Sequence, residues 1–114
     1  MLGVVLAPTL ARAAELIMFE RDGCPYCARW DRDVAPTYPL TDVGKMAPLR
    51  RINLDRQKPD VALAAPVRFT PTFVLMDEGR EIGRITGYMD DAMFWGVFSK
   101  LAQKLAQASP AQER

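Results

Sequence analysis

The two cysteines of this chain lie in one tetrapeptide, Cys24-Pro25-Tyr26-Cys27. Residues at i and i+3 share one face of a helical turn, so a disulfide between them can form, but it closes too small a loop to add much stability. The chain has no histidine, so two thiolates fall short of the four ligands of a structural zinc site. Ser/His/Asp and Cys/His catalysis are excluded for the same reason. Redox chemistry is therefore favoured, with a metal shared between two chains as the alternative.

The length and charge of the chain limit its class. The sequence has 114 residues, which allows one domain and excludes a two-domain enzyme. Hydrophobic residues make up 49% and charged residues 25%, which are the proportions of a globular protein. The formal net charge of +1 creates no overall field that would attract nucleic acid or an anionic membrane. We therefore expect one globular domain with no nucleic-acid partner.

The apolar N-terminal run has the pattern of a targeting signal. Residues 1–13 form an apolar run that closes on Ala11-Arg12-Ala13, the small-x-small form of a signal-peptidase site. The run is shorter than the roughly twenty apolar residues that span a bilayer. It predicts a signal-peptide remnant and export to an oxidising compartment, with an N-terminal arm packed on the domain as the alternative. The predicted organisation is a leader at 1–13, a domain at 14–107 and a tail at 108–114.

Hydrophobic patterning predicts the elements of the first half of the chain. The continuous apolar run at 16–19 suits a central strand covered on both faces, and the alternation at 49–55 suits a sheet edge. Between them a helix opens at the cysteine pair, where Pro25 fits the first helical position because its missing N–H costs nothing there. A capped helical turn is expected at 41–46. The Arg50-Arg51 pair is interpreted as a solvated strand face.

The second half predicts a short helix at 61–65, a hairpin and a long helix. The hairpin joins a β-rich run at 68–76 to 81–86 through a polar turn. The long helix covers 90–107, and helical spacing gives it an apolar stripe formed by Phe94, Val97, Phe98, Leu101 and Leu105.

With this order of elements, the sequence resembles the thioredoxin superfamily over residues 15–106. Three features carry the resemblance: the cysteine tetrapeptide, Thr70-Pro71-Thr72 before an apolar strand, and Gly87-Tyr88 before an amphipathic helix. The resemblance implies an α/β, thioredoxin-like fold. Its central four-stranded mixed sheet would have two parallel strands followed by an antiparallel hairpin, flanked by helices, with CxxC at the N-terminus of the first helix.

A finer resemblance is to the SoxS-type periplasmic thiol-disulfide oxidoreductases of bacterial sulfur oxidation. It is carried by Tyr38-Pro39-Leu40-Thr41, Ala47-Pro48-Leu49-Arg50-Arg51 and Ile85-Thr86-Gly87-Tyr88. It implies a periplasmic protein that reduces a disulfide or mixed disulfide on a partner protein, such as a sulfur-oxidation carrier. A membrane thiol-disulfide transporter would donate the electrons. We expect a monomer without cofactor or metal.

Position gives the two cysteines different roles. Cys24 would lie at the helix N-terminus, where unpaired N–H groups and the helix dipole stabilise a thiolate. It is therefore the predicted nucleophile, which attacks a substrate disulfide and forms a mixed disulfide. Cys27, one turn deeper and more shielded, is predicted to resolve that mixed disulfide and release the reduced substrate.

Four further residues are predicted to bind substrate. In the resembled superfamily the proline at Pro71 follows a cis peptide bond and lies against the cysteine pair. The residue before it, here Thr70, offers backbone hydrogen bonds to an extended substrate segment. Pro25 and Tyr26, between the cysteines, complete the predicted set.

One departure from the superfamily concerns proton transfer. Classical thioredoxins have a buried acid six residues before the first cysteine, and this chain has Met18 there. Glu20 or Asp22 could replace that acid, although both have the character of exposed turn residues.

A second departure points toward glutathione. The dipeptide between the cysteines is Pro-Tyr, as in glutaredoxins. Arg21, Asp90 and Asp91 resemble the positions at which glutaredoxins hold glutathione carboxylates through a basic group and a helix N-terminus. Tyr88 stands where glutaredoxins often have a second glycine, which disfavours close backbone approach of the tripeptide.

Three functions follow for the chain. The leading one is a periplasmic dithiol reductant that acts on a partner protein through Cys24 and Cys27. The second is a glutathione-dependent, glutaredoxin-like reductase. The third is a non-catalytic binding module whose CxxC face docks a partner without turnover.

Overall fold

The computed structural model of the chain describes residue 3 and residues 13–108. The predicted leader at 1–13 and tail at 108–114 therefore fall almost wholly outside the described residues. The predicted domain at 14–107 lies within them.

Four strands form one mixed sheet in the order β2-β1-β3-β4. β1 (Glu15–Glu20) pairs in parallel with β2 (Leu49–Asn53), and it pairs in antiparallel fashion with β3 (Thr72–Asp77). β3 continues through a tight turn into β4 (Arg80–Thr86). This is the predicted sheet, with the continuous apolar strand at its centre and the alternating strand at its edge.

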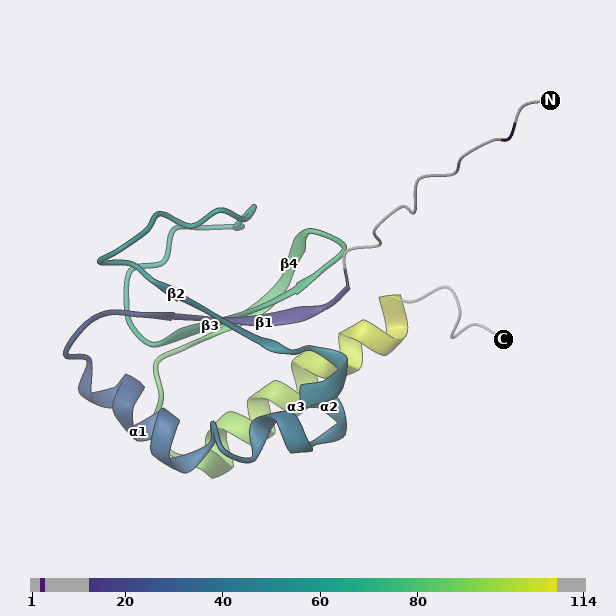
Figure 1. The fold of residues 1–114 in the computed structure, drawn as a ribbon. Coiled ribbons are helices and arrows are strands. Elements are labelled where there is room, and N and C mark those ends of the chain that lie inside the picture. The colour runs from purple at the N-terminus through teal and green to yellow at the C-terminus, as the bar shows by residue number, and fades with distance from the viewer. Residues whose placement is uncertain (1–2, 4–12, 109–114) are drawn as a thin grey trace.

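Three α-helices and one 3-10 turn complete the described elements: α1 (Pro25–Asp33), η1 (Tyr38–Leu40), α2 (Asp42–Met46) and α3 (Asp91–Ala108). The helices lie on one face of the sheet, and the long segment between β2 and β3 runs over the other face (Figure 1). The predicted capped turn at 41–46 is confirmed, because the Thr41 hydroxyl accepts the N–H of Gly44 at 2.9 Å.

The central strand supplies both hydrophobic cores. Its alternate side chains Leu16 and Met18 are buried with the helices, and Ile17 and Phe19 are buried with the segment that covers the opposite face. All four side chains are fully buried. A strand covered on both faces needs a continuous apolar run, which is what residues 16–19 provide.

The larger core centres on Trp30 of α1. Its ring centroid lies 5.0 Å from that of Phe73 and 5.6 Å from that of Phe94, so α1 is packed against both β3 and α3. Tyr38 is fully buried and its hydroxyl donates to the carbonyl of Ala47 at 2.6 Å. This aromatic cluster holds α1, and with it the cysteine pair, in a fixed place against the sheet.

The predicted apolar stripe of α3 is wrong at one position. Phe94, Phe98 and Leu105 are buried and Leu101 packs against the core, but Val97 is 37% exposed. Ala102 is buried on the inner face of α3. Helical periodicity predicted the buried face of α3 correctly. The contact with the sheet is narrower than the predicted stripe, so Val97 at its edge is exposed.

The predicted helix at 61–65 is also wrong, because these residues form an irregular loop. A helix of five residues is marginal by itself and depends on caps and tertiary contacts, such as the Thr41 cap of α2. Tertiary contacts fix the loop: the N–H of Ala64 donates to Glu81 at 2.8 Å, and Arg84 donates to the carbonyls of Ala65 and Pro66 at 2.8 and 3.2 Å. Val61, Leu63 and Val67 of this loop segment pack against the smaller core on that face of the sheet.

Replacing Glu81 by glutamine is expected to lower the free energy of unfolding at neutral pH by about 1–2 kcal/mol. Glu81 pairs with Arg84 at 2.7 Å and holds the loop. The Arg84 hydrogen bond keeps the pKa of the Glu81 carboxyl below its ordinary value. A lowered folded-state pKa stabilises the fold above the unfolded-state pKa of about 4.3, and this contribution is lost as pH falls through the folded-state value.

Urea unfolding of wild type and Glu81→Gln between pH 3 and pH 7 measures this contribution. The difference between the two proteins should shrink toward acid pH. Glu78→Gln is the matched control, because Glu78 is an exposed residue of the same hairpin. An equal loss of stability in both variants, or a difference that does not change with pH, would contradict the assignment.

Candidate active site

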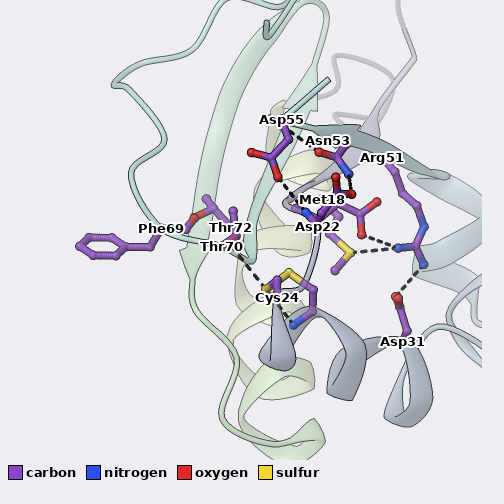
Figure 2. The surroundings of a disulfide bond; sticks show 12 residues. Met18, Asp22, Cys24, Asp31, Arg51, Asn53, Asp55, Phe69, Thr70 and Thr72 are labelled. Carbon is purple, nitrogen blue, oxygen red and sulfur yellow. Dashed lines mark hydrogen bonds and ion pairs between the residues drawn. A yellow bond between two sulfur atoms is a disulfide. The ribbon is translucent and has the colours of Figure 1, made fainter. Parts of the chain in front are cut away.

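The cysteine pair forms the start of α1. Cys24 has an extended backbone and is the N-cap, its Sγ accepts the N–H of Cys27 at 3.1 Å, and Pro25 is the first helical residue. Cys24 and Cys27 are joined in a disulfide (Figure 2). The side chain of an N-cap residue satisfies one of the free N–H groups of the first turn. The Cys24 sulfur therefore lies where a negative charge is most favourable.

The two sulfurs differ in burial. Cys27 is 4% exposed and belongs to the core cluster with Met18 and Trp30, whereas Cys24 is only partly buried. A substrate can reach the sulfur of Cys24 more easily than that of Cys27.

The Thr70-Pro71 segment is brought against the disulfide from a distant part of the chain. Its peptide bond is cis, and the Thr70 hydroxyl donates to Sγ of Cys24 at 3.4 Å (Figure 2). The carbonyl of Pro71 accepts the N–H of Gly87 at 2.7 Å, and Gly87 has a positive φ of 89° that favours glycine. The structure thus gathers three predicted sites, Cys24, Thr70 and Pro71, with the Gly87 turn behind them.

A shallow apolar pocket of about 320 Å³ opens beside the disulfide. Two predicted substrate-binding regions meet in it, since Tyr26 forms one wall and the Thr70-Pro71 segment another. Tyr26 is 52% exposed, and Phe69, which precedes Thr70 in the sequence, is 65% exposed. The pocket is lined by Tyr26, Thr70, Pro71, Thr86, Gly87, Tyr88, Met89 and Met93.

Arg51 lies against the position where thioredoxins have their buried acid. Met18 is fully buried, and Nη1 of Arg51 lies 3.6 Å from its sulfur. The same guanidinium pairs with Glu20 at 3.1 Å and with Asp31 of α1 at 2.7 Å (Figure 2). The central carbon of this guanidinium lies 5.9 Å from the centroid of the Trp30 ring. Arg51 therefore links β2 and the end of β1 to α1.

Arg51 is exposed and Arg50 is partly exposed, as expected for a solvated strand face, and the structure adds ion pairs that the sequence did not predict. Both side chains are ion-paired, Arg50 with Glu15 and Asp60 at 3.1 Å each. The Glu15 hydrogen bond raises the pKa of the Arg50 guanidinium above its ordinary value. The partners come from distant positions, so the pattern within the strand could not reveal them.

The structure places the two candidate acids in ion pairs outside the core. Glu20 ends β1 and pairs with Arg51. Asp22 is exposed, and hydrogen bonds from Arg56 and Asn53 hold the pKa of its carboxyl below the usual range. Lowering this pKa makes Asp22 a weak proton acceptor.

Two of the three residues of the glutathione hypothesis already have polar partners. Arg21 is ion-paired with Asp55 at 2.7 Å, and the Asp90 carboxylate accepts the N–H of Met93 at 2.8 Å. Asp91 begins α3. Among residues 13–108, no hydrogen bond or ion pair joins Arg21 to Asp90 or Asp91. The N-terminus of α3 thus already carries negative charge, which disfavours a second carboxylate there.

Sequence reasoning missed one cluster at the site. Arg29 of α1 contacts the rings of Tyr26 and Tyr88, and Tyr88 donates to Asp33 of the same helix at 2.8 Å. Arg29 and Asp33 are four residues apart and share a helix face, which was the signal available. Their partner at Tyr88 is visible only when α1 and the loop after β4 are placed side by side.

A family model of the thioredoxin-like domain matches residues 11–102. The chain belongs to the thioredoxin-like family, and with its CxxC pair it is a thiol-disulfide oxidoreductase. The sequence-based resemblance is thereby confirmed.

Within that family the chain is similar to the periplasmic thioredoxin SoxS from Paracoccus pantotrophus. The two are 47% identical, the match covers 81% of this chain and 98% of that one, and the TM-score is 0.76. The fold is also similar to that of a thioredoxin-fold protein from Helicobacter pylori, at 24% identity, coverage of 86% and 74%, and a TM-score of 0.65. Mitochondrial thioredoxin 3 from Saccharomyces cerevisiae matches at 21% identity, coverage of 77% and 79%, and a TM-score of 0.54.

A search of curated proteins found no match to the sequence. Among the described residues, none of the helices has the length and apolar character needed to cross a membrane.

Proposed function

We propose that this protein is a periplasmic reductant that reduces a disulfide or mixed disulfide on a partner protein through Cys24 and Cys27. The observation that carries the proposal is the unequal exposure of the two sulfurs at the start of α1, one facing Thr70 and the other buried. Similarity to a periplasmic thioredoxin over 98% of that chain supports the compartment.

The proposed reaction balances as a dithiol-disulfide exchange. The Cys24 thiolate attacks one sulfur of the substrate disulfide, forms a mixed disulfide and displaces the other substrate sulfur as a thiolate. The Cys27 thiolate then attacks Sγ of Cys24 and displaces the second substrate sulfur. The substrate gains two electrons and two protons in all, and the protein is left with the Cys24–Cys27 disulfide. A dithiol donor restores the reduced pair, and we propose a membrane thiol-disulfide transporter for this step.

The geometry supports Cys24 as the attacking sulfur. The N–H of Cys27 and the Thr70 hydroxyl both donate to it, at 3.1 and 3.4 Å. Donors that are already in place stabilise a thiolate without reorganisation, both in the free dithiol and when the sulfur becomes a leaving group. Cys27 is only 4% exposed, which suits a sulfur that reacts only within the protein.

The partner is proposed from the relative. SoxS-type proteins belong to bacterial sulfur oxidation, and this chain is 47% identical to one such periplasmic thioredoxin in a match that covers 81% of this chain. We propose a sulfur-oxidation carrier protein with an oxidised cysteine as the substrate. The glutathione-dependent alternative uses the same cysteine pair and would need Arg21, Asp90 and Asp91 to bind the tripeptide.

Reduction of insulin disulfides by catalytic amounts of the protein tests the proposal. With dithiothreitol as the terminal reductant we expect the protein to accelerate insulin precipitation at least about tenfold over dithiothreitol alone. With the same thiol concentration of reduced glutathione we expect no acceleration, because Arg21 is engaged by Asp55.

Arg21→Ala and Arg56→Ala form a matched pair for the glutathione arm, since each removes one exposed, ion-paired arginine near the start of α1. A glutathione-driven reaction that Arg21→Ala abolishes and Arg56→Ala leaves intact would establish the glutaredoxin-like alternative. Failure to accelerate insulin reduction with either reductant would contradict both functions.

A further inference from the structure

Arg29 is one of the residues through which α1 contacts the loop that lines one side of the apolar pocket. It lies in α1, two residues after Cys27. Its guanidinium carbon is 5.6 Å from the ring centroid of Tyr26 and 5.9 Å from that of Tyr88. Its Nη2 also donates to the backbone carbonyl of Met89 at 2.9 Å. One side chain therefore contacts a residue between the two cysteines and two residues of the loop after β4.

Tyr88 is held from a second direction by the same helix. Its hydroxyl donates to the Asp33 carboxylate at 2.8 Å, and the residue is 4% exposed. Burial, together with this hydrogen bond, raises the pKa of the Tyr88 hydroxyl, so it stays protonated as a donor throughout the neutral range. Tyr88 is thus a fixed wall. Tyr26, by contrast, is 52% exposed, and Arg29 is the contact that ties it to that wall.

The pocket between these walls carries no charge. Its eight lining residues are polar-neutral, aromatic or thioether side chains, a proline and a glycine. Arg29 lies behind the tyrosine rings and is not among the lining residues. A charged substrate side chain in this pocket would lose water without gaining a partner, whereas an apolar one would gain contact with the rings and with the sulfurs of Met89 and Met93.

We propose that Arg29 is a positioning residue for substrate selection. It holds Tyr26 and the Gly87–Met89 loop as the walls of a neutral subsite next to Cys24, which accepts an uncharged apolar side chain beside the substrate's disulfide. The proposal rests on the proposed reductase function. Its physical basis is preorganisation: walls that are already in place lose little freedom when the substrate binds.

Steady-state kinetics on three substrates tests this role. Two are peptides with one cystine that differ only in a leucine or an aspartate beside one cysteine, and the third is 2-hydroxyethyl disulfide, which is too small to use the subsite. For wild type we expect a lower KM for the leucine peptide than for the aspartate peptide. Arg29→Met should raise the KM for the leucine peptide about 5- to 20-fold, leave kcat within about twofold and reduce the preference for leucine.

Two further variants separate positioning from general damage. Arg29→Lys keeps the charge but not the planar guanidinium that lies near both rings, so its KM for the leucine peptide should lie between those of wild type and Arg29→Met. Arg80→Met is the matched control, because Arg80 is an exposed arginine at the start of β4, at the opposite end of that strand from the pocket residue Thr86, and it should leave all three substrates unchanged. The thermal unfolding midpoint of each variant is recorded alongside.

Different results would overturn different statements. An unchanged KM and leucine preference in Arg29→Met would overturn the positioning role while wild-type turnover kept the reductase function. An equal loss of activity toward 2-hydroxyethyl disulfide and toward the leucine peptide in Arg29→Met would also overturn the positioning role, since Arg29 would then act on the Cys24 sulfur. No reduction of any of the three substrates by wild type would overturn the proposed function itself.

Discussion

Cys24→Ser is expected to remove the acceleration of insulin reduction and return the rate to that of dithiothreitol alone, a loss of at least about tenfold, because loss of a nucleophile removes the covalent step entirely. The sulfur of Cys24 is the partly exposed one of the pair, and it accepts hydrogen bonds from the N–H of Cys27 and the Thr70 hydroxyl. A serine hydroxyl at this position cannot exchange with a disulfide. The remaining thiol, Cys27, is buried in the core and should not replace it.

Ala28→Ser is the matched control for this variant. Ala28 is exposed and follows Cys27 directly, so the change adds one hydroxyl to the same helical turn without touching either sulfur. It should retain wild-type turnover. If Cys24→Ser kept more than about a tenth of the wild-type acceleration over dithiothreitol alone, Cys27 could act first, and the assignment of roles would be wrong.

The cysteine pair also distinguishes an enzyme from a docking module. A protein that only binds its partner through the CxxC face would show no turnover as wild type, and its Cys24→Ser variant would keep its affinity for the partner. The measured rate of insulin reduction by wild type therefore decides between these two functions before any variant is made.

Much of the fold could be predicted from local patterns. The continuous apolar run at 16–19 predicted a strand with two buried faces, and the structure buries its alternate side chains in two separate cores. The alternation at 49–55 predicted an edge, which is where β2 lies. Pro25 predicted the first residue of α1, because proline is tolerated there and not one turn later.

The errors arose where a tertiary contact outweighed the local pattern. The loop at 61–65 contains helix-forming alanines, but the carboxylate of Glu81 and the guanidinium of Arg84 supply its hydrogen bonds instead. The expected apolar face of α3 was one residue too wide at Val97. Both outcomes depend on neighbours that lie far away in the sequence.

The same reason explains the parts of the site that were missed. Arg51 is adjacent to Met18 only through the parallel pairing of β1 and β2, in which these two residues are partners. Arg29 reaches Tyr88 across 59 positions of sequence, through the packing of α1 on the loop after β4. The cysteines and the Thr70-Pro71 segment were predictable because their types are rare and their spacing is distinctive, whereas arginines on a surface are common.

The Cys27→Ser protein, incubated with insulin whose disulfides are intact and analysed by intact mass, gives the most direct test of the proposed mechanism. Serine at this buried position leaves Cys24 able to attack but removes the sulfur that would release the product. We expect most of the protein to accumulate as a mixed disulfide, with the insulin chain mapped to Cys24 after proteolysis. Wild type treated in the same way should show no stable adduct. Absence of an adduct on Cys27→Ser, or its appearance on the Cys27 thiol of Cys24→Ser, would contradict Cys24 as the attacking sulfur and Cys27 as the resolving one.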